Sequence, residues 1–400
     1  MKNITLSLIA FLVCSSSYSQ PFAALTSGTS TTLYAITFVN DSTGFAVGLN
    51  GTILKTTNGG TTWAPQASGV TTELRDVAFY DINTGYVVGI GGLILKTTNR
   101  GSTWVQLTSG TTNNLTKIHI HGNDIYASGA SGTMLRSSNA GLSWSSLNTG
   151  TANILYGSYF TDTNTGYVAG NSGTILKTTN AGVNWSPLSS GTYVQLVDIY
   201  FTDTNNGYIV GGDVNTNSGI VLKTTNAGAS WTSQTFTNNY FGNVRFLDGV
   251  TGFISGGDIT ADASTILKTM DAGTSWQIQT SNSSRQYGAS FPSFNAGYTC
   301  GLDGTILKTS GINAGVDNLS LDNTIWIYPN PSCGKFHLTF DNTLLTKKCQ
   351  LEIYNMIGEK ILQQNIVSDI DLSSSSKGVY FYRVTKEKNE IVGNGKLVVQ

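Results

Sequence analysis

The 400-residue chain has little of what usually supports catalysis, nucleic-acid binding or a fold built on disulfides. It contains 4 cysteines, 6 prolines and 3 histidines, and charged residues make up 11% of it. Four cysteines are too few to hold together a chain of this length. The formal net charge of −1 gives little long-range attraction for nucleic acid or for an anionic membrane, so neither is an expected partner.

Long apolar runs are also missing. After the N-terminus no segment approaches the roughly 18 apolar residues that a membrane helix needs, so we expect no transmembrane segment in the mature chain. Residues 1–19 combine Lys2, an apolar stretch and the small residues Ser17 and Ser19, which predicts a secretory signal cleaved before Gln20. Cys14 leaves a lipoprotein signal as an alternative, although Val13 stands where a small residue is expected. We therefore expect export through the periplasm.

One sequence motif is repeated many times instead. It runs from Gly51 to Trp63 as GTILKTTNGGTTW and returns at intervals of about 40 to 46 residues. A Gly-aromatic pair such as Gly85-Tyr86 recurs with about the same spacing. A seventh copy begins at Gly304 but has no tryptophan after it. Periods of this length are typical of repeat folds. The repeated tryptophans are Trp63, Trp104, Trp144, Trp185, Trp231 and Trp276.

Each repeat divides into four short runs rich in β-branched and aromatic residues, separated by Gly, Asn, Asp and Ser, which predicts four antiparallel strands. Seven such sheets must bury both faces against neighbours, which predicts an all-β, seven-bladed β-propeller over residues 20–310. The seventh repeat lacks its fourth strand. Phe22 to Gly28 has the aromatic-to-glycine spacing of Trp63 to Gly69, so we expect this N-terminal segment to close the ring, with Phe22 in the tryptophan position.

The turn before each tryptophan, Thr-x-Asn-x-Gly-x-Thr/Ser-Trp, resembles the Asp-box or BNR repeat, in which an Asp side chain caps the turn. The whole repeat resembles the seven-bladed propellers of the photosystem II assembly and stability factor family over residues 22–310. That resemblance implies a binding platform without cofactor or catalysis. Basic residues on the innermost strands are few here, namely Arg75, Arg245 and Lys117, so binding to photosystem subunits is not carried over.

The composition changes after the repeats. Residues 311–324 read as a linker of small residues. Residues 325–400 resemble the C-terminal sorting domain of type IX (Por) secretion cargo, which implies a small β-sandwich, recognition by the secretion machinery and release or attachment at the outer cell surface. Cys333 and Cys349 could form a disulfide in an exported protein. The landmarks of the resemblance include Tyr328, Pro329, Asn330, Pro331, Gly358, Gly378, Tyr380 and Lys396.

Candidate binding residues lie where the repeat is interrupted. Insertions between the second and third strands of repeats five and six lengthen two neighbouring loops, and propeller geometry puts these loops on the face of the inter-blade connections. Phe241 and Tyr193 are expected on the same face. Carboxylates, amides and aromatic rings there could bind a cation or a sugar. The candidate ligand-binding residues are Asp213, Asn215, Asn217, Asp258, Asp262, Glu73, Arg75, Tyr240 and Arg285.

The sequence therefore favours a secreted or cell-surface, non-catalytic module that binds an extracellular protein or glycan. The alternative is a secreted carbohydrate-active hydrolase with an acidic pair, Glu73 with Asp213 or Asp258, because glycosidases need two facing carboxyl groups. His119 and His121 alternate on one strand, but no third ligand lies near them in sequence, so we expect no metal site. No catalytic residue and no cofactor are predicted.

Overall fold

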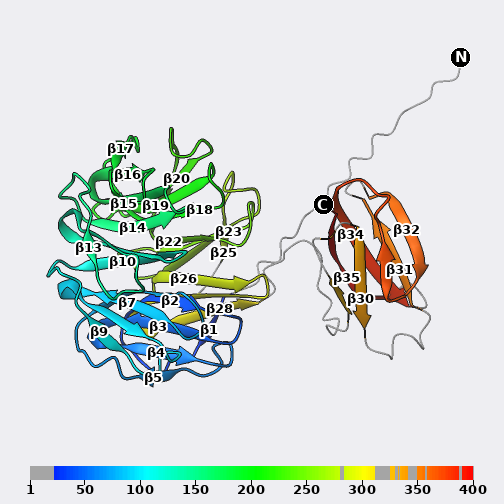
Figure 1. Cartoon of the computed structure of the whole chain (residues 1–400), viewed down its shortest axis with the longest axis horizontal. Coiled ribbons are helices and arrows are strands. Elements are labelled where there is room, and N and C mark those ends of the chain that lie inside the picture. The colour runs from blue at the N-terminus through cyan, green and yellow to red at the C-terminus, as the bar shows by residue number, and fades with distance from the viewer. Residues whose placement is uncertain are drawn as a thin grey trace, which may run out of the picture. The chain divides into compact units, whose positions relative to one another are not determined.

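The computed structural model describes residues 22–279, 283–310, 325–328, 332, 334–340, 349–355, 358–386 and 390–399. The predicted signal, the linker 311–324 and Pro329, Asn330, Pro331 and Cys333 lie outside these residues. The chain divides into two compact units, residues 1–314 and 315–400 (Figure 1). Every helical segment in the described part is a three-residue 3₁₀ turn, so no helix there could cross a bilayer.

The described strands of residues 22–310 form seven four-stranded antiparallel sheets, here called blades 1 to 7. Blade 1 contains β2 (Leu33–Phe38), β3 (Gly44–Gly48), β4 (Ile53–Thr56) and β5 (Ala64–Gln66). Blade 2 contains β6 (Leu74–Phe79), β7 (Gly85–Gly89), β8 (Ile94–Thr97) and β9 (Val105–Leu107); blade 3, β10 (Leu115–His121), β11 (Asp124–Gly129), β12 (Met134–Ser137) and β13 (Ser145–Ser146); blade 4, β14 (Leu155–Phe160), β15 (Gly166–Gly170), β16 (Ile175–Thr178) and β17 (Ser186–Leu188). Blade 5 contains β18 (Gln195–Phe201), β19 (Gly207–Asp213), β20 (Ser218–Thr224) and β21 (Thr232–Thr237); blade 6, β22 (Tyr240–Phe246), β23 (Gly252–Gly257), β24 (Ser264–Thr269) and β25 (Gln277–Gln279).

Blade 7 draws its strands from both ends of this unit. It contains β26 (Gln286–Ser293), β27 (Ala296–Gly301), β28 (Ile306–Ser310) and β1 (Ala23–Leu25). Strand β1 pairs antiparallel with β28, Ala24 lying opposite Leu307. Phe22 is buried and meets Phe253 of blade 6 edge-on at 6.3 Å, as Trp104 of blade 2 meets Phe45 of blade 1 at 6.4 Å.

Stacked aromatic rings join six of the seven pairs of neighbouring blades. The aromatic of the Gly-aromatic pair, on the second strand, stacks on a ring at the end of the next blade's first strand. The centroids are 3.8 to 4.4 Å apart in six of the seven joints. Ile120 replaces the ring in the joint between blades 2 and 3. The stacked pairs are Phe45–Phe79, Tyr126–Phe160, Tyr167–Phe201, Tyr208–Phe246, Phe253–Phe291 and Tyr298–Phe38.

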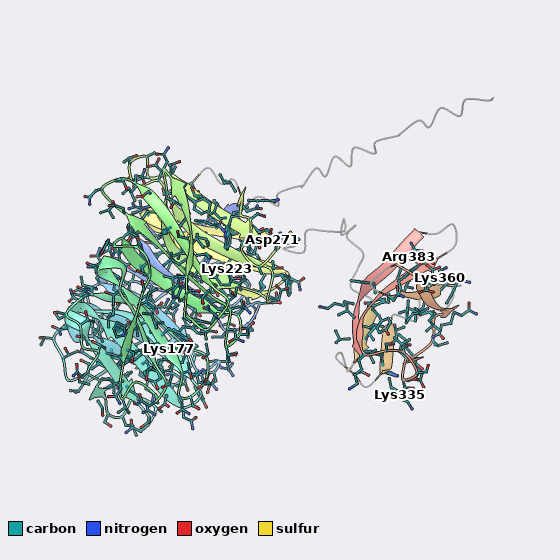
Figure 2. The ribbon with its side chains drawn as sticks, turned by 90° about the horizontal axis from the view of Figure 1, so that it is seen from above. Lys177, Lys223, Asp271, Lys335, Lys360 and Arg383 are labelled. Carbon is teal, nitrogen blue, oxygen red and sulfur yellow. The ribbon has the colours of Figure 1, made fainter. Side chains whose placement is uncertain are left out.

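The repeated lysine and tyrosine hold the Asp-box turn of the following blade. Lys177, labelled with its blade 5 equivalent Lys223 in Figure 2, donates to the carbonyl of Ala227 at 2.9 Å, and so does Tyr167. Ala227 has a φ of +54°, which turns its carbonyl toward these donors. Asparagine caps this turn, as the resemblance to the Asp-box predicts. Asn226 Oδ1 accepts the N–H of Ser230 at 3.0 Å.

The second unit contains two antiparallel sheets whose buried side chains form one core cluster. Buried Glu352 accepts hydrogen bonds from Lys360 and from Arg383, both at 2.6 Å; the two cations lie side by side in Figure 2. Tyr380 and Cys349 belong to the core. The strands are β29 (Ile325–Tyr328), β30 (Lys335–Phe340) and β33 (Asp369–Asp371) in one sheet, and β32 (Lys360–Asn365), β31 (Gln350–Tyr354), β34 (Gly378–Lys386) and β35 (Glu390–Val399) in the other.

Candidate functional site

The first strands of the seven blades surround a cavity of about 720 Å³. Each first strand is the inner edge of its sheet, because neighbouring first strands contact one another around the ring, β26 and β2 included. Each blade contributes at least one polar or aromatic side chain to the wall. From blade 1 to blade 7 the lining includes Tyr34, Arg75, Lys117, Tyr156, Asp198, Arg245 and Tyr287.

An innermost strand has a free edge, so some of its backbone N–H groups have no partner within their own sheet. Side chains of the preceding blade accept several of them. Asp76 accepts the N–H of Ile118 at 3.0 Å, and Asp198 accepts that of Val244 at 3.1 Å. In the joint between blades 7 and 1, Ser290 Oγ accepts a hydrogen bond from the backbone of β2. The two buried carboxylates therefore have a structural role in joining blades.

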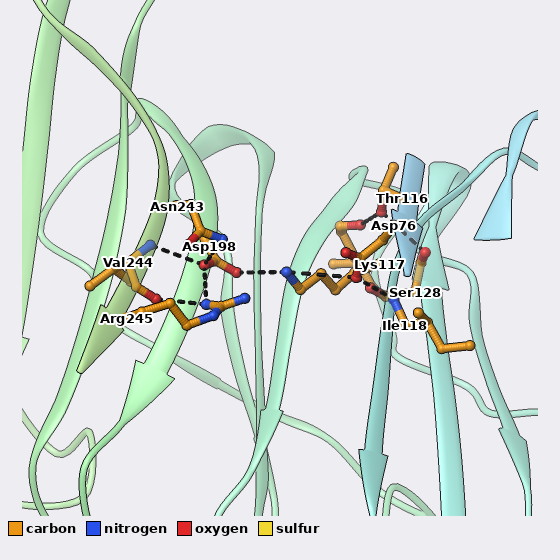
Figure 3. A network of polar contacts seen from close by, with 10 residues as sticks. Asp76, Thr116, Lys117, Ile118, Ser128, Asp198, Asn243, Val244 and Arg245 are labelled. Atoms are coloured by element: carbon orange, nitrogen blue, oxygen red, sulfur yellow. Dashed lines mark hydrogen bonds and ion pairs between the residues drawn. The ribbon is translucent and has the colours of Figure 1, made fainter. Parts of the chain in front are cut away.

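The carboxylates also organise a network of charges across the cavity wall. Asp198 accepts from Arg245 at 2.7 Å and from Asn243 at 2.9 Å, and Lys117 Nζ lies 3.2 Å from its other oxygen. Figure 3 shows Lys117 extending between Asp198 and Asp76, whose Oδ2 lies 3.7 Å from Nζ. Blades 2, 3, 5 and 6 are linked in this way.

The two carboxylates respond differently to burial. Asp198 is 1% exposed, and burial opposes its ionisation, but Arg245 and Lys117 outweigh that effect and hold its pKa below the ordinary value. For Asp76 burial outweighs the attraction of Lys117, so its pKa is raised. Opposite shifts within one cavity are a pattern that acid–base catalysis can use, which makes this pair relevant to the question of enzymatic activity.

Tyrosine rings and two arginines gather at the ends of the first strands. The rings of Tyr34 and Tyr287 have centroids 5.5 Å apart, and the Arg75 guanidinium lies over Tyr34 at 4.5 Å. Glu73 pairs with Arg75 at 2.5 Å. Arg285 donates to the Tyr287 hydroxyl at 2.8 Å.

Four of the candidate residues thus lie at or beside the cavity. Arg75 and Tyr240 are part of its wall, and Glu73 and Arg285 contact wall residues. The Tyr240 hydroxyl donates to Gln195 at 2.5 Å. Phe241, which the sequence placed on the exposed face, is fully buried in the core between blades 5 and 6. Strand alternation explains the difference, because Tyr240 and Phe241 point to opposite faces of β22.

The residues of the two long loops are placed outside the cavity wall. Where five blades have a three-residue 3₁₀ turn between the second and third strands, blades 5 and 6 have these longer loops, as the insertions predicted. Asp213 accepts the N–H of Asn215 at 2.8 Å within its own turn. Asn217 donates to Asp258 at 2.8 Å and so joins the two loops. Asp262 lies 3.9 Å from Arg285.

The oxygens of these loops mainly serve the loops themselves. Asp258 Oδ1 accepts from the N–H and hydroxyl of Thr260 and from the N–H of Ala261. These bonds favour the carboxylate and lower its pKa to about 2. The described residues contain no cluster of three or more metal-ligating side chains. His119 of the suspected histidine pair accepts the N–H of Phe160 at 3.2 Å.

Asp76, Asp198 and Asn243 are among the site residues that sequence reasoning missed. A signal was present in the internal register of the repeats. Asp76 stands two residues after Leu74, as Lys117 does after Leu115 and Asp198 after Leu196. Aligning the first strands on this leucine would have shown that the same position carries opposite charges in different blades.

Comparison with known proteins agrees with this architecture. The family model described as Photosynthesis system II assembly factor YCF48 matches residues 14–110, 66–152 and 142–310. The model described as Secretion system C-terminal sorting domain matches residues 326–400. No curated protein matches the chain by sequence.

Solved structures show the same fold. A YCF48 protein bound to D1 peptide has a TM-score of 0.61 at 20% identity, covering 74% of this chain and 97% of its own. YCF48 from Cyanidioschyzon merolae has a TM-score of 0.58 at 18% identity, covering 73% and 99%. The GH74 enzyme from Niastella koreensis has a TM-score of 0.60 at 14% identity, covering 94% and 74%. These similarities include binding proteins and hydrolases, so they establish the propeller fold alone.

The sorting-domain match indicates type IX secretion, to the medium or the cell surface. The repeat matches extend over residues 14–310, well beyond half of the chain. The chain therefore belongs to the Photosynthesis system II assembly factor YCF48 family, and it carries a secretion system C-terminal sorting domain after its repeats.

Proposed function

We propose that the chain is a non-catalytic binding module for an extracellular protein or glycan, exported by type IX secretion and located outside the cell or on its surface. In this proposal the repeats, residues 20–310, form a propeller closed by the N-terminal strand. Residues 311–324 form a linker, and residues 325–400 form a β-sandwich sorting domain. The ligand binds at the end of the propeller that carries Arg75 and Tyr240.

The observation that carries this proposal is the state of the acidic residues considered for catalysis. Glu73 is paired with Arg75 at 2.5 Å. Asp258 has a pKa lowered to about 2 by the hydrogen bonds of its own turn, whereas a general acid needs a pKa near the working pH. Asp213 caps the turn that follows it. Each carboxylate is already committed to a structural partner, which favours binding over hydrolysis.

The position of the ligand is supported by the tyrosines, arginines and amides around the cavity. The YCF48 structure with a bound D1 peptide supports a protein segment as one ligand class. We include Glu73, Arg285 and the loop residues Asp213, Asn215, Asn217, Asp258 and Asp262 in the binding face, with the loops acting as its rim.

A carbohydrate-active hydrolase is the second candidate, and two observations favour it. A GH74 enzyme is among the similar structures, and Asp76 and Asp198 have pKa values shifted in opposite directions. Both carboxylates are nevertheless buried and hydrogen-bonded to the backbone of the next blade, which leaves them badly placed to reach a sugar bond.

One experiment separates the two functions. The purified full chain is incubated with peptide and glycan arrays to measure binding, and with neutral polysaccharides to measure released reducing ends. We expect binding without release. Release that disappears in Asp76→Asn or Asp198→Asn, each shown to remain folded, would establish the hydrolase instead. Binding is then remeasured in Arg75→Ala and in a variant with Asp213, Asp258 and Asp262 all changed to Ala.

A further inference from the structure

The shape of the axial cavity limits how a ligand can enter it. All seven blades contribute lining residues, and neighbouring first strands contact one another around the whole ring. In the joint between blades 7 and 1, Ser290 holds the backbone of Phe38 at 3.0 Å. The wall formed by the described residues is therefore continuous around the axis. A ligand must enter along the axis, which a small molecule or the end of a chain can do.

The charges of the wall are balanced. Its three cationic side chains, Arg75, Lys117 and Arg245, each lie within 3.2 Å of a carboxylate oxygen. Burial lowers the pKa of His119, which also lines the cavity, to about 3, so this ring is neutral at ordinary pH. A charged ligand would lose its hydration on entering the cavity, and no unpaired opposite charge in the wall would offset that loss. The cavity therefore favours a neutral ligand over the ionised end of a peptide.

Asn243 belongs to the cavity wall, but its amide is turned toward Asp198. It lines the cavity and is 5% exposed. Its Nδ2 donates to Asp198 at 2.9 Å, which fixes the orientation of the amide, because the opposite orientation would point an oxygen at the carboxylate. Its Oδ1 has no hydrogen-bond partner among the described residues. That oxygen is itself buried, so a ligand in the cavity cannot reach it, and recognition depends on the other polar groups of the wall.

Tyrosine rings complete the wall. The lining includes Tyr34, Tyr156, Tyr159, Tyr200, Tyr240 and Tyr287. A tyrosine ring offers an apolar face and a polar hydroxyl. A sugar ring has the matching arrangement, with C–H groups on its faces and hydroxyls at its edge. The volume of about 720 Å³ lies within the range of small-molecule sites.

We propose that the axial cavity binds the terminal residues of a neutral saccharide chain, with the tyrosine rings packing on the sugar faces and the tyrosine hydroxyls bonding to sugar hydroxyls. This inference rests on the proposed binding function and narrows its ligand to a chain end.

The test counts chain ends. Neutral oligosaccharides of two to six residues, from glucan, xylan and mannan, are titrated calorimetrically into the full chain. The polymer of the best-bound type is then compared before and after partial acid hydrolysis at equal mass. We expect the number of binding sites per gram to rise in proportion to the number of chain ends. A number that stays constant would mean recognition of internal segments and would overturn the inference.

Variants identify the cavity as the site. Tyr34→Ala and Tyr156→Ala should each weaken binding at least tenfold. Tyr80→Ala is the matched control, because Tyr80 is 53% exposed and is not part of the cavity wall, and it should bind normally. Thermal unfolding of each variant detects loss of fold, and Tyr156 provides a second test if Tyr34→Ala disturbs the contacts of Tyr34 with Tyr287 and Arg75.

The other outcomes are distinct. Binding that is unchanged in both folded cavity variants would overturn the inference. Capture of neutral peptides with no saccharide bound would also overturn it while leaving the binding module intact, and so would the absence of any saccharide binding. Hydrolysis of the oligosaccharides during titration would overturn the proposed function itself.

Discussion

Tyr298 of blade 7 donates a hydrogen bond of 3.0 Å to the carbonyl of Gly59, which precedes it by 239 residues in blade 1. Lys308 donates to the same carbonyl at 2.8 Å. Tyr86 and Lys96 make the same two contacts with Ala140 between blades 2 and 3. The last and first blades are therefore joined by the same polar contact as blades that follow one another in sequence.

Tyr298→Phe removes one of the two donors to Gly59. We expect a loss of about 1 kcal/mol in the free energy of unfolding, the usual net value of one hydrogen bond, measured by urea denaturation. Tyr80→Phe is the control, since Tyr80 is exposed and its hydroxyl makes only a long 3.4 Å contact with Asn123. Equal stability of the two variants would show that the contact does not help to hold blades 7 and 1 together.

Gly101 and Gly110 illustrate two different reasons for glycine in the repeat, namely close packing and a positive φ. Both have positive φ, +74° and +80°. A Cβ at Gly101 would lie 2.4 Å from the Phe45 ring, whereas a Cβ at Gly110 would have nothing within 4 Å. We expect Gly110→Ala to cost about 1 kcal/mol from backbone strain and Gly101→Ala to cost about 1 to 3 kcal/mol more from overpacking. Similar losses in denaturation experiments would contradict a packing role for Gly101.

Proline substitutions test whether β1 closes the ring. Pro65 and Pro187 occupy the second residue of the outer strands of blades 1 and 4, opposite Leu54 and Leu176. Ala24 has the equivalent place opposite Leu307. Because the N–H groups that face the partner strand alternate along an antiparallel strand, we expect Ala24→Pro to be tolerated.

The next residue along β1 should behave differently. Leu25→Pro removes an N–H that faces β28 as well as the leucine side chain. It should lower the melting temperature further than Leu25→Ala, which removes the side chain alone. If Leu25→Pro and Leu25→Ala unfold at the same temperature, pairing between β1 and β28 does not contribute to stability.

The repeats explain how much of the fold could be predicted. Each of the seven copies of the motif predicts the same strands and turns. The residues equivalent to Tyr86 and Trp104, in the copies that contain them, indicate where neighbouring blades pack. The place of Phe22 against Phe253 follows from its spacing to Gly28. Local sequence and tertiary packing agree at these positions, which is why sequence patterns were sufficient.

The cavity could not be predicted in the same way, because its residues differ from blade to blade. Asp76, Lys117 and Asp198 occupy equivalent strand positions but form one network across the axis. Such contacts join residues that are distant in sequence, and the register of the repeats shows only that opposite charges occupy the same strand position, not that these side chains meet. The loop aspartates were predicted as binding residues because the insertions are visible in the sequence. In the structure, Asp258 mainly stabilises its own turn.

His119 makes stability depend on pH. Burial, with smaller effects from His121, Lys117 and Arg245, lowers its pKa to about 3 from an ordinary value of 6.5. Between these values the unfolded chain binds more protons, so the stabilising effect is complete above pH 6.5 and is lost as the pH falls toward 3. The slope approaches about 1.4 kcal/mol per pH unit.

His119→Gln should flatten this dependence. Glutamine keeps an acceptor for the N–H of Phe160 but does not titrate. Urea denaturation between pH 7 and pH 5 stays above the ordinary range of Asp and Glu, and the raised pKa of Asp76 affects both proteins, so the variant should lose less stability than the parent chain over that interval. A variant with the parent slope would assign the pH dependence to other groups.

Export should depend on the sorting domain. In a bacterium with type IX secretion, a chain ending at residue 324 should accumulate in the periplasm, because the N-terminal signal carries it only across the inner membrane, and the domain matched at residues 326–400 is needed for the second crossing. The full chain carrying Tyr193→Ala, a surface change in the repeats, is the control and should appear outside the cell. Immunoblots of periplasm, surface and medium measure the distribution of each chain.

Equal export of the truncated and full chains would contradict the assignment of residues 325–400 as a sorting domain. Export of a periplasmic reporter fused to residues 311–400 would show that this segment is sufficient.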